Sequence, residues 1–271
     1  MNVRNSMRRW FHFRKSQTEV GSNFPVQGKS KDRRGDLFAY FKPSSFVSEQ
    51  FRMIRTILLR LAKNNNFRTI LVTSALPGEG KTFVSSNLAV TLAKEVTNNV
   101  ILVDIDVRNS SLCALFGLSK EKTGLSSYFS KNIKISDVSY NTGIPNLTII
   151  PSGQFPEKPS EVISREKIGR LLSAIKSQYG DCYIIIDSGP VQLLADTLVM
   201  AELVDGIVLV VKLGHTKKSM LKKTAETLGV NKIVGVVLNY CDLSVKVYKQ
   251  YHNYYDVTRK AGEKSSASHK E

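Results

Sequence analysis

The sequence predicts an α/β fold: a doubly wound, mostly parallel sheet with helices on both faces. Two observations predict it, namely short apolar runs rich in Ile and Val, and helix-length segments between them. The runs cover residues 69–74, 100–103, 182–186, 206–211 and 233–238, and a shorter run at 147–150 is expected to add a strand. Runs that are apolar throughout suit parallel strands buried on both faces, with the helices as crossovers. Residues 132–145 show no clear period and are left unassigned.

The chain is expected to hold one domain flanked by two tails. Residues 1–42 are rich in Ser, Asn, Lys, Arg and Gly without a sustained period, which predicts a flexible basic arm. Residues 43–242 are expected to form the folded domain, and residues 243–271 a C-terminal helix and a charged, tyrosine-rich tail. Before the first strand, Phe51, Ile54, Leu58 and Leu61 recur at three- and four-residue steps. This spacing predicts an amphipathic helix over residues 49–63.

Composition narrows the class of protein. The 271 residues carry a formal net charge of +16, much of it near the chain ends, which points to an anionic surface such as a membrane or a nucleic acid. The three cysteines are too far apart for a zinc site and odd in number, so a reducing cytoplasm is expected. No run approaches the roughly 18 to 20 apolar residues of a membrane-spanning helix, and Met1 is not followed by a signal-peptide core. The protein is therefore expected to be neither spanning nor secreted.

The N-terminal stretch 7–15 interleaves aromatic and basic residues: Trp10, Phe11 and Phe13 lie among four arginines and lysines. This composition favours a segment that settles on an anionic bilayer, so we expect peripheral attachment to the inner face of the cell membrane. A plain disordered arm is the alternative. Single-stranded nucleic acid would suit the same composition, but nothing else in the chain supports it, and no nucleic-acid partner is expected.

The strongest motif lies between the first strand and the helix that follows it. Pro77, Gly78, Glu79, Gly80, Lys81, Thr82 and Phe83 form the loop and open the helix. Glycines let backbone N–H groups turn toward phosphate oxygens, and the helix N-terminus adds its positive dipole end. Lys81 is placed to reach the β and γ phosphates of ATP, and the Thr82 hydroxyl to bind Mg²⁺. Ala75 stands where the general pattern has its first glycine.

Three carboxylates stand at strand ends. Asp104 and Asp106 follow the run 100–103, and Asp187 follows the run 182–186. Buried carboxylates are costly without a metal or a donor, and ligands of such sheets bind at the carboxyl ends of the strands. We therefore expect one Mg-nucleotide site, with Asp187 as the Walker B acid. Alone, such acids are equally typical of caps and turns.

These motifs resemble the bacterial tyrosine kinases (BY-kinases), the P-loop autokinases of capsule and exopolysaccharide assembly. The resemblance covers roughly residues 48–255 and rests on PGEGKT at 77–82, LVDIDVR at 102–108, SLCALFGLSKEKTGLSSYF at 111–129 and PSGQFPEKPSEVI at 151–163. It implies a P-loop NTPase fold of the MinD/ParA-like, deviant Walker group. It also implies transfer of the γ-phosphoryl group of ATP to tyrosine, with Mg²⁺ as cofactor.

The resemblance assigns roles to particular residues. Asp104 would accept or orient the tyrosine proton, with Asp106 and Asp187 around the metal together with Thr82, although either of the first two acids could be the base. Asn239 would help to hold the nucleotide base, or could equally be a turn residue. The pattern Glu-x-x-Arg-x-x-Arg, which the family uses to build rings between subunits, is Glu49, Arg52 and Arg55; a solvated helix face is the alternative.

The tail tyrosines are Tyr248, Tyr251, Tyr254 and Tyr255. In the resembled family such a cluster is the autophosphorylation substrate, presented to a neighbouring subunit; packing on a helix is the alternative. Because family members without a spanning segment are activated by a separate membrane adaptor, the resemblance implies a transmembrane polysaccharide co-polymerase as partner.

Two other functions stay open on the sequence. A positioning ATPase of the MinD/ParA type shares the fold, but Leu76 occupies the position of that group's signature lysine. A catalytically weak nucleotide-binding adaptor of an export complex is suggested by Ser188-Gly189-Pro190, where the family usually has Thr-Pro-Pro. Together with Asn109-Ser110 after Arg108, these changes also suggest a weak kinase. Gly189 is expected to loosen the backbone beside the metal.

Overall fold

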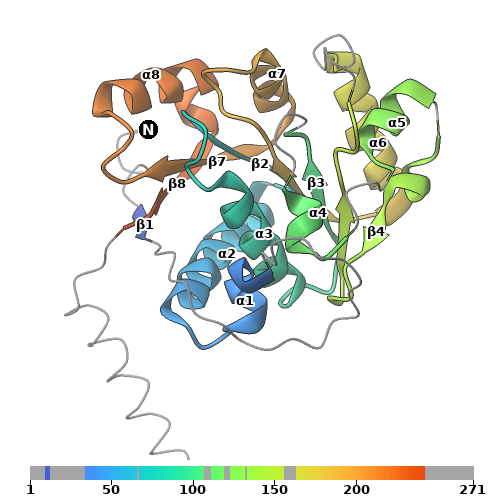
Figure 1. The fold of residues 1–271 in the computed structure, drawn as a ribbon, viewed down its shortest axis with the longest axis horizontal. Helices are drawn as coiled ribbons and strands as arrows, with labels where there is room; N and C mark the ends of the chain where they lie inside the picture. The colour runs from blue at the N-terminus through green and yellow to red at the C-terminus, as the bar shows by residue number, and fades with distance from the viewer. Residues whose placement is uncertain are drawn as a thin grey trace, which may run out of the picture.

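The computed structural model describes residues 10–12, 34–65, 67–106, 111–118, 123–131, 133–155 and 163–241. Within them, an eight-stranded sheet has the order β1-β8-β7-β2-β6-β3-β5-β4 (Figure 1). The strands are β1 (Trp10–His12), β2 (Thr69–Ser74), β3 (Val100–Asp104), β4 (Tyr140–Asn141), β5 (Leu147–Ile150), β6 (Tyr183–Asp187), β7 (Gly206–Lys212) and β8 (Ile233–Asn239). Only β4 runs antiparallel to its neighbour; the other described pairs are parallel. The predicted mostly parallel α/β sheet is confirmed.

Helices cover both faces of the sheet (Figure 1). They are α1 (Phe38–Phe41), α2 (Phe46–Asn65), α3 (Lys81–Ala93), α4 (Leu112–Leu115), α5 (Leu125–Lys131), α6 (Arg165–Tyr179), α7 (Ala195–Leu203) and α8 (Lys218–Leu228), with short 3-10 turns at Arg34–Asp36, Ile135–Val138 and Val230–Lys232. Alternate residues of β2 face opposite cores. Ile70 and Val72 pack with α1 to α4, whereas Leu71 packs with α5 to α8. This alternation makes the sheet doubly wound.

The six predicted strands match β2, β3, β5, β6, β7 and β8 to within about one residue, because their sequences are mostly apolar. The helix expected over residues 49–63 is α2, which begins three residues earlier, at Phe46, and ends at Asn65. The unassigned segment 132–145 contains a 3-10 turn and the two-residue strand β4. These pieces are too short to produce a period in the sequence.

The flexible arm predicted for residues 1–42 ends too late in the sequence, because residues 37–39 belong to the folded core. Leu37, Phe38 and Ala39 are buried, and the Phe38 ring contacts the Phe83 ring edge-on, with centroids 5.9 Å apart. Asn87 of α3 fastens this segment by donating to the carbonyl of Asp36 at 2.9 Å and accepting from the backbone N–H of Ala39 at 2.9 Å. Residues 10–12 also add a parallel strand to the edge of β8. A short aromatic segment that packs through long-range contacts has no sequence period to reveal it.

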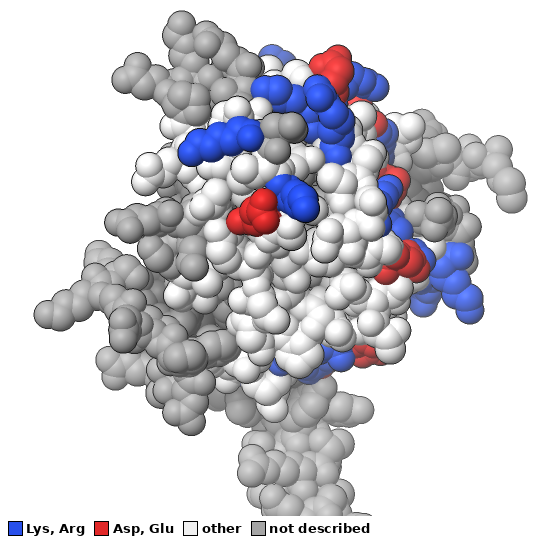
Figure 2. Space-filling view, turned by 90° about the vertical axis from the view of Figure 1, so that its right-hand side faces the viewer, with Lys and Arg blue, Asp and Glu red and all other residues white. Residues whose placement is uncertain are grey.

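The described surface carries its charges unevenly. On the face shown in Figure 2, Lys and Arg side chains gather toward the upper rim, several beside Asp or Glu, and a broad central area is almost uncharged. Among the described helices, none has the length and apolar character needed to cross a membrane.

Candidate active site

The loop between β2 and α3 has the conformation of a phosphate cradle. Gly78 and Gly80 adopt the left-handed φ values of +73° and +94°, which L-residues with a side chain rarely do. At Gly80 a Cβ would lie 2.0 Å from Nδ2 of Asn239, so the loop approaches the end of β8 as closely as glycine allows. The α3 helix begins at Lys81, directly after this turn. Backbone N–H groups of the first helical turn are therefore available to an anion.

The three predicted acids meet at adjacent strand ends. Asp104 of β3 and Asp187 of β6 are partners in the sheet register, and the N–H of Ile105 donates to the carbonyl of Asp187 at 2.8 Å. Oδ1 of Asp104 accepts from the backbone N–H of Asp106 at 3.0 Å. Asp104 thus fixes the turn that carries Asp106. All three acids are buried, with Asp106 the most exposed at 7%.

Asp187 lies where the loop and the acids converge. Burial raises the pKa of its carboxyl from 3.8 to about 7, and the charge of Asp106 also raises it. Hydrogen bonds from Thr82 and Ser85 and the positive charge of Lys81 act in the opposite direction. Oδ1 of Asp187 is buried and has no hydrogen-bond partner among the described residues. A buried oxygen without a donor is destabilising unless a cation neutralises it.

These residues fit Mg²⁺. The Thr82 hydroxyl and the carboxylates of Asp106 and Asp187 are oxygen donors, and the orphaned Oδ1 of Asp187 offers a ligand atom. The described chain has no cluster of three or more His, Cys, Asp or Glu residues able to hold a metal. Mg²⁺ seldom needs one, because it is usually held by one or two carboxylates together with substrate phosphates and water.

Three of the predicted nucleotide-contacting residues have side chains engaged elsewhere. The Phe83 ring packs against Phe38 and, at 5.8 Å between centroids, against Phe51. The Asn239 amide donates to the carbonyl of Glu79 at 2.9 Å and accepts from the N–H of Tyr240 at 2.9 Å, so it braces the loop. The Glu79 carboxylate is fully buried within the protein. Any contact of Phe83 with phosphate is left to its backbone.

Sequence reasoning missed Ser85 and the surroundings of Gly189. Ser85 follows Thr82 by three residues on α3, a spacing that places both hydroxyls on one side of the helix. The carbonyl of Gly189 accepts from the hydroxyls of Thr73 at 2.9 Å and Thr197 at 3.2 Å. The expected loosening of the backbone at Gly189 is therefore wrong, because two side chains from other elements hold its carbonyl.

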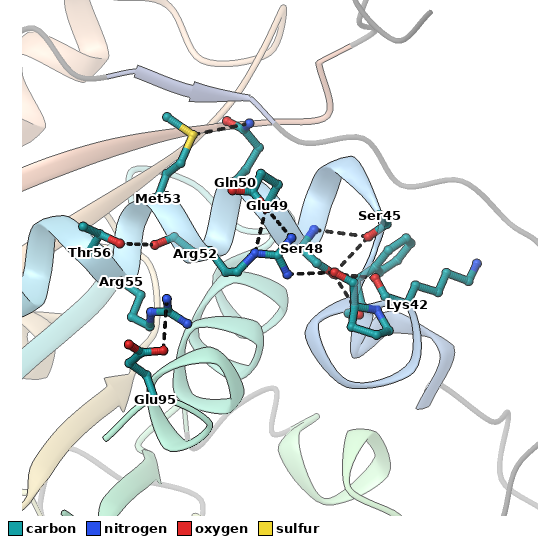
Figure 3. A network of polar contacts seen from close by, with 12 residues as sticks. Lys42, Ser45, Ser48, Glu49, Gln50, Arg52, Met53, Arg55, Thr56 and Glu95 are labelled. Atoms are coloured by element: carbon teal, nitrogen blue, oxygen red, sulfur yellow. Dashed lines mark hydrogen bonds and ion pairs between the residues drawn. The ribbon is translucent and has the colours of Figure 1, made fainter. Parts of the chain in front are cut away.

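The interface pattern lies on α2 and is engaged within the chain (Figure 3). Arg52 pairs with Glu49 one turn away, and its Nη1 donates to the carbonyl of Pro43 at 2.8 Å. Arg55 reaches Glu95, after α3, at 3.3 Å. Its Nε is buried and has no partner among the described residues. The tail tyrosines 248, 251, 254 and 255, the arm's aromatic residue at 13 with its basic neighbours, and residues 107–110 lie outside the described residues.

The fold and the site define a P-loop nucleotide-binding protein. A family model described as an AAA domain matches residues 67–228. "Tyrosine-protein kinase CpsD" of Streptococcus agalactiae is 34% identical over 210 residues, which cover 77% of this chain and 90% of that protein. The chain belongs to the bacterial tyrosine-protein kinase family, whose enzymes phosphorylate tyrosine.

Solved structures agree. The kinase domain of Escherichia coli tyrosine kinase ETK superposes with a TM-score of 0.73 and 26% identity, covering 84% of this chain and 88% of that one. The chimerical protein CapA2B2 superposes with a TM-score of 0.72 and 28% identity, covering 85% of this chain and 93% of that one. The cell division ATPase MinD of Pyrococcus furiosus shares the fold alone. It superposes with a TM-score of 0.54 and 22% identity, covering 68% of this chain and 78% of that one.

Proposed function

We propose that this chain transfers the γ-phosphoryl group of ATP to tyrosines of its own C-terminal cluster, Tyr248, Tyr251, Tyr254 and Tyr255, in the control of exopolysaccharide or capsule polymerisation and export. One observation carries the proposal: β8 ends at Asn239, whose amide touches the phosphate loop at Glu79. The chain therefore leaves the described domain beside the proposed reaction centre. Tyr248 follows nine residues later, a span of about 30 Å when extended. That reach suits delivery of the tail to a neighbouring subunit.

In the proposed reaction the tyrosine oxygen attacks the γ-phosphorus, the bond to the β-γ bridging oxygen breaks, and ADP leaves. Lys81 and the loop N–H groups hold the phosphates and offset developing charge. Mg²⁺, bound by Thr82, Asp106 and Asp187, would neutralise the β and γ oxygens. The charge of Lys81 and the hydroxyl of Thr82 already act on Asp187, which supports a shared site.

The tyrosine proton passes to a carboxylate. Asp104 is supported by the family resemblance, although it is fully buried and one oxygen already holds the N–H of Asp106. Asp106 is slightly more exposed, at 7%. The base is one of these two acids. Asp104→Asn and Asp106→Asn, compared for the pH dependence of turnover, distinguish them because the base sets the acidic limb.

We propose a ring-like homo-oligomer built through Glu49, Arg52 and Arg55 of α2. The exposed Met53, at 48%, lies on the same helix and supports a contact surface there. The partner would be a transmembrane polysaccharide co-polymerase that acts as adaptor, with the kinase in the cytoplasm at the inner face of the membrane. The similarity to the chimerical protein CapA2B2 supports a linked partner, and the basic arm 1–15 would add attraction to anionic lipid.

The rival functions receive less support. Leu76 stands where the positioning ATPases have their signature lysine, and its apolar side chain cannot supply that charge to a partner's nucleotide. The weak-adaptor alternative rested on Ser188 and Gly189. Ser188 Oγ donates to the carbonyl of Val72 at 3.1 Å, and the Gly189 carbonyl is held from two sides. The changed sequence therefore keeps an ordered backbone.

The test is incubation with ATP and Mg²⁺ followed by anti-phosphotyrosine detection and phosphosite mapping. Wild type is compared with Lys81→Met, with a variant carrying Phe at the four tail positions, and with Tyr179→Phe on α6 as matched control. We expect phosphotyrosine in the C-terminal cluster of wild type and of Tyr179→Phe, and none in the other two variants. A wild type that stays unphosphorylated, with and without membranes bearing the adaptor, contradicts the proposal.

A further inference from the structure

An acidic side chain sits inside a loop built to receive a polyphosphate. Glu79 lies between Gly78 and Gly80, and its side chain is fully buried. A carboxylate beside phosphate groups repels them, and a buried carboxylate is costly unless donors compensate it. Glu79 makes no salt bridge among the described residues. Its compensation comes from three neutral donors, one in the phosphate loop itself and two in the turn after β7.

Those donors lie at the ends of neighbouring strands. Oε2 accepts from the backbone N–H of Leu76 at 2.8 Å, which closes the turn of the loop upon itself. Oε1 accepts from the N–H of Lys212, the last residue of β7, at 3.1 Å, and from the Thr216 hydroxyl before α8. One carboxylate thus joins the loop after β2 to the turn after β7, and β2 and β7 are paired in the sheet.

The backbone of Glu79 is held as well. Its carbonyl accepts from Nδ2 of Asn239 at the end of β8, and the Asn239 carbonyl in turn accepts from the N–H of Leu213 at 3.0 Å. Side chain and backbone of one residue therefore tie the phosphate loop to the ends of both β7 and β8. The loop reaches this position only because Gly80 has no Cβ to displace Asn239.

From this geometry we infer that Glu79 is a positioning residue: its carboxylate holds the phosphate loop in its nucleotide-binding shape by fastening it to the β7–α8 turn. The inference rests on the proposed function for the identity of the nucleotide. It assigns Glu79 no contact with phosphate. A carboxylate is required because both oxygens act as acceptors; in glutamine one of them becomes an NH₂ group, which meets N–H or O–H donors without an acceptor.

Loop shape acts on binding before chemistry. Because the phosphate-facing N–H groups must converge without reorganisation, loosening the fastening lowers nucleotide affinity more than it lowers turnover of the bound complex. If Glu79 only stabilised the fold, its substitution would change different kinetic constants. Partial unfolding lowers the active fraction, and so the apparent kcat, while KM for ATP stays unchanged.

The test uses the full chain and Mg-ADP, so that binding is measured without phosphoryl transfer. Glu79→Gln is compared with Thr216→Val, which removes one donor, and with Glu226→Gln, which changes an exposed acid of α8 that pairs with Lys222 one turn away. By calorimetric titration we expect Kd for Mg-ADP to rise at least tenfold in Glu79→Gln and threefold to tenfold in Thr216→Val. Glu226→Gln should match wild type. In the kinase assay KM for ATP should rise by a similar factor, with kcat changed less than threefold.

An affinity of Glu79→Gln equal to or tighter than wild type overturns the inference, because removal of repulsion would then outweigh any positioning. If Glu79→Gln fails to fold, Thr216→Val decides, and an unchanged Kd in a folded Thr216→Val variant likewise overturns it. A wild type that binds Mg-ADP but phosphorylates nothing contradicts the proposed kinase and leaves the binding comparison intact.

Discussion

Asp104 and Asp187 are register partners at the carboxyl ends of the neighbouring parallel strands β3 and β6. The sheet alone brings these carboxylates together, although they are 83 residues apart in sequence. The consequence is electrostatic: Asp187 is buried beside the charge of Asp106, and both effects raise the pKa of its carboxyl. The protein without metal therefore carries an electrostatic cost at Asp187, which the proposed binding of Mg²⁺ with nucleotide would relieve.

That cost predicts an unusual pH dependence of stability. The pKa of Asp187 is raised from 3.8 to about 7, chiefly by burial, so the folded state holds the proton more tightly than the unfolded state. The free energy of unfolding of the metal-free protein should fall as pH rises from about 4 to about 7, by up to about 1.4 kcal/mol per pH unit from this group. Asp187→Asn should become increasingly more stable than wild type across that window. Urea denaturation at a series of pH values measures the difference.

Asp181 supplies a control of opposite sign. Its pKa is lowered, chiefly by the hydrogen bond from Arg68, whose Nε lies 2.7 Å away. The pair's stabilisation is present at neutral pH and is lost as pH falls through the lowered pKa. Asp181→Asn should therefore be less stable than wild type at neutral pH, with the gap closing in acid. A parallel pH dependence for the two variants contradicts the assignment of Asp187.

A second prediction concerns the two loop glycines. In Gly80→Ala the new Cβ would lie 2.0 Å from Nδ2 of Asn239, which is too close. The hydrogen bond from that amide to the carbonyl of Glu79 must therefore break. In Gly78→Ala nothing lies within 4 Å, and only the strain of φ +73° remains, roughly 1 kcal/mol. We expect Mg-ADP affinity to fall at least tenfold in Gly80→Ala and much less in Gly78→Ala. Calorimetry and melting curves of both variants measure this, and equal losses would show that Asn239 does not brace the loop.

The features that the sequence predicts correctly are those that depend on residues close together in the chain. Six of the eight described strands are visible because burial leaves them mostly apolar. Lys81 and Thr82 are recognisable because they open the helix after a glycine-rich loop, and the three acids because they stand at or just after strand ends. The sequence predicts that Glu79 and Asn239 contact the nucleotide, because it does not reveal their long-range contacts within the protein. Asn239, for example, donates to a carbonyl 160 residues away in the sequence. Phe38 falls within the predicted flexible arm because its burial depends on a distant residue, Phe83 of α3, whose ring packs against both Phe38 and Phe51 of α2. Tertiary packing of single side chains leaves no period to detect.

A third prediction separates two roles of Arg55. Within one chain Arg55 pairs with Glu95, which is half exposed; between chains, it would build the ring. Arg55→Ala and Glu49→Ala should weaken self-association at least tenfold, whereas Glu95→Gln removes the internal pair and should leave association within twofold of wild type. Light scattering over a concentration series gives the mass of each variant. If Glu95→Gln dissociates as readily as Arg55→Ala, Arg55 serves α2 packing and the interface proposal is wrong.

The last prediction concerns Gly189, where the resembled family usually has proline. A Cβ at this position would lie 2.0 Å from Cδ1 of Leu194 and 3.3 Å from its Cγ. Gly189→Ala should therefore destabilise by about 1–3 kcal/mol, the usual cost of overpacking. Leu194→Ala removes the obstructing atoms, so the double variant should be more stable than the sum of the single effects predicts. Coupling energies between contacting residues are typically about 0.5–3 kcal/mol, and urea denaturation of the four proteins of the cycle measures it. Strict additivity would contradict this account, because it would mean that the Leu194 side chain moves aside freely and that contact with Leu194 does not require glycine at position 189.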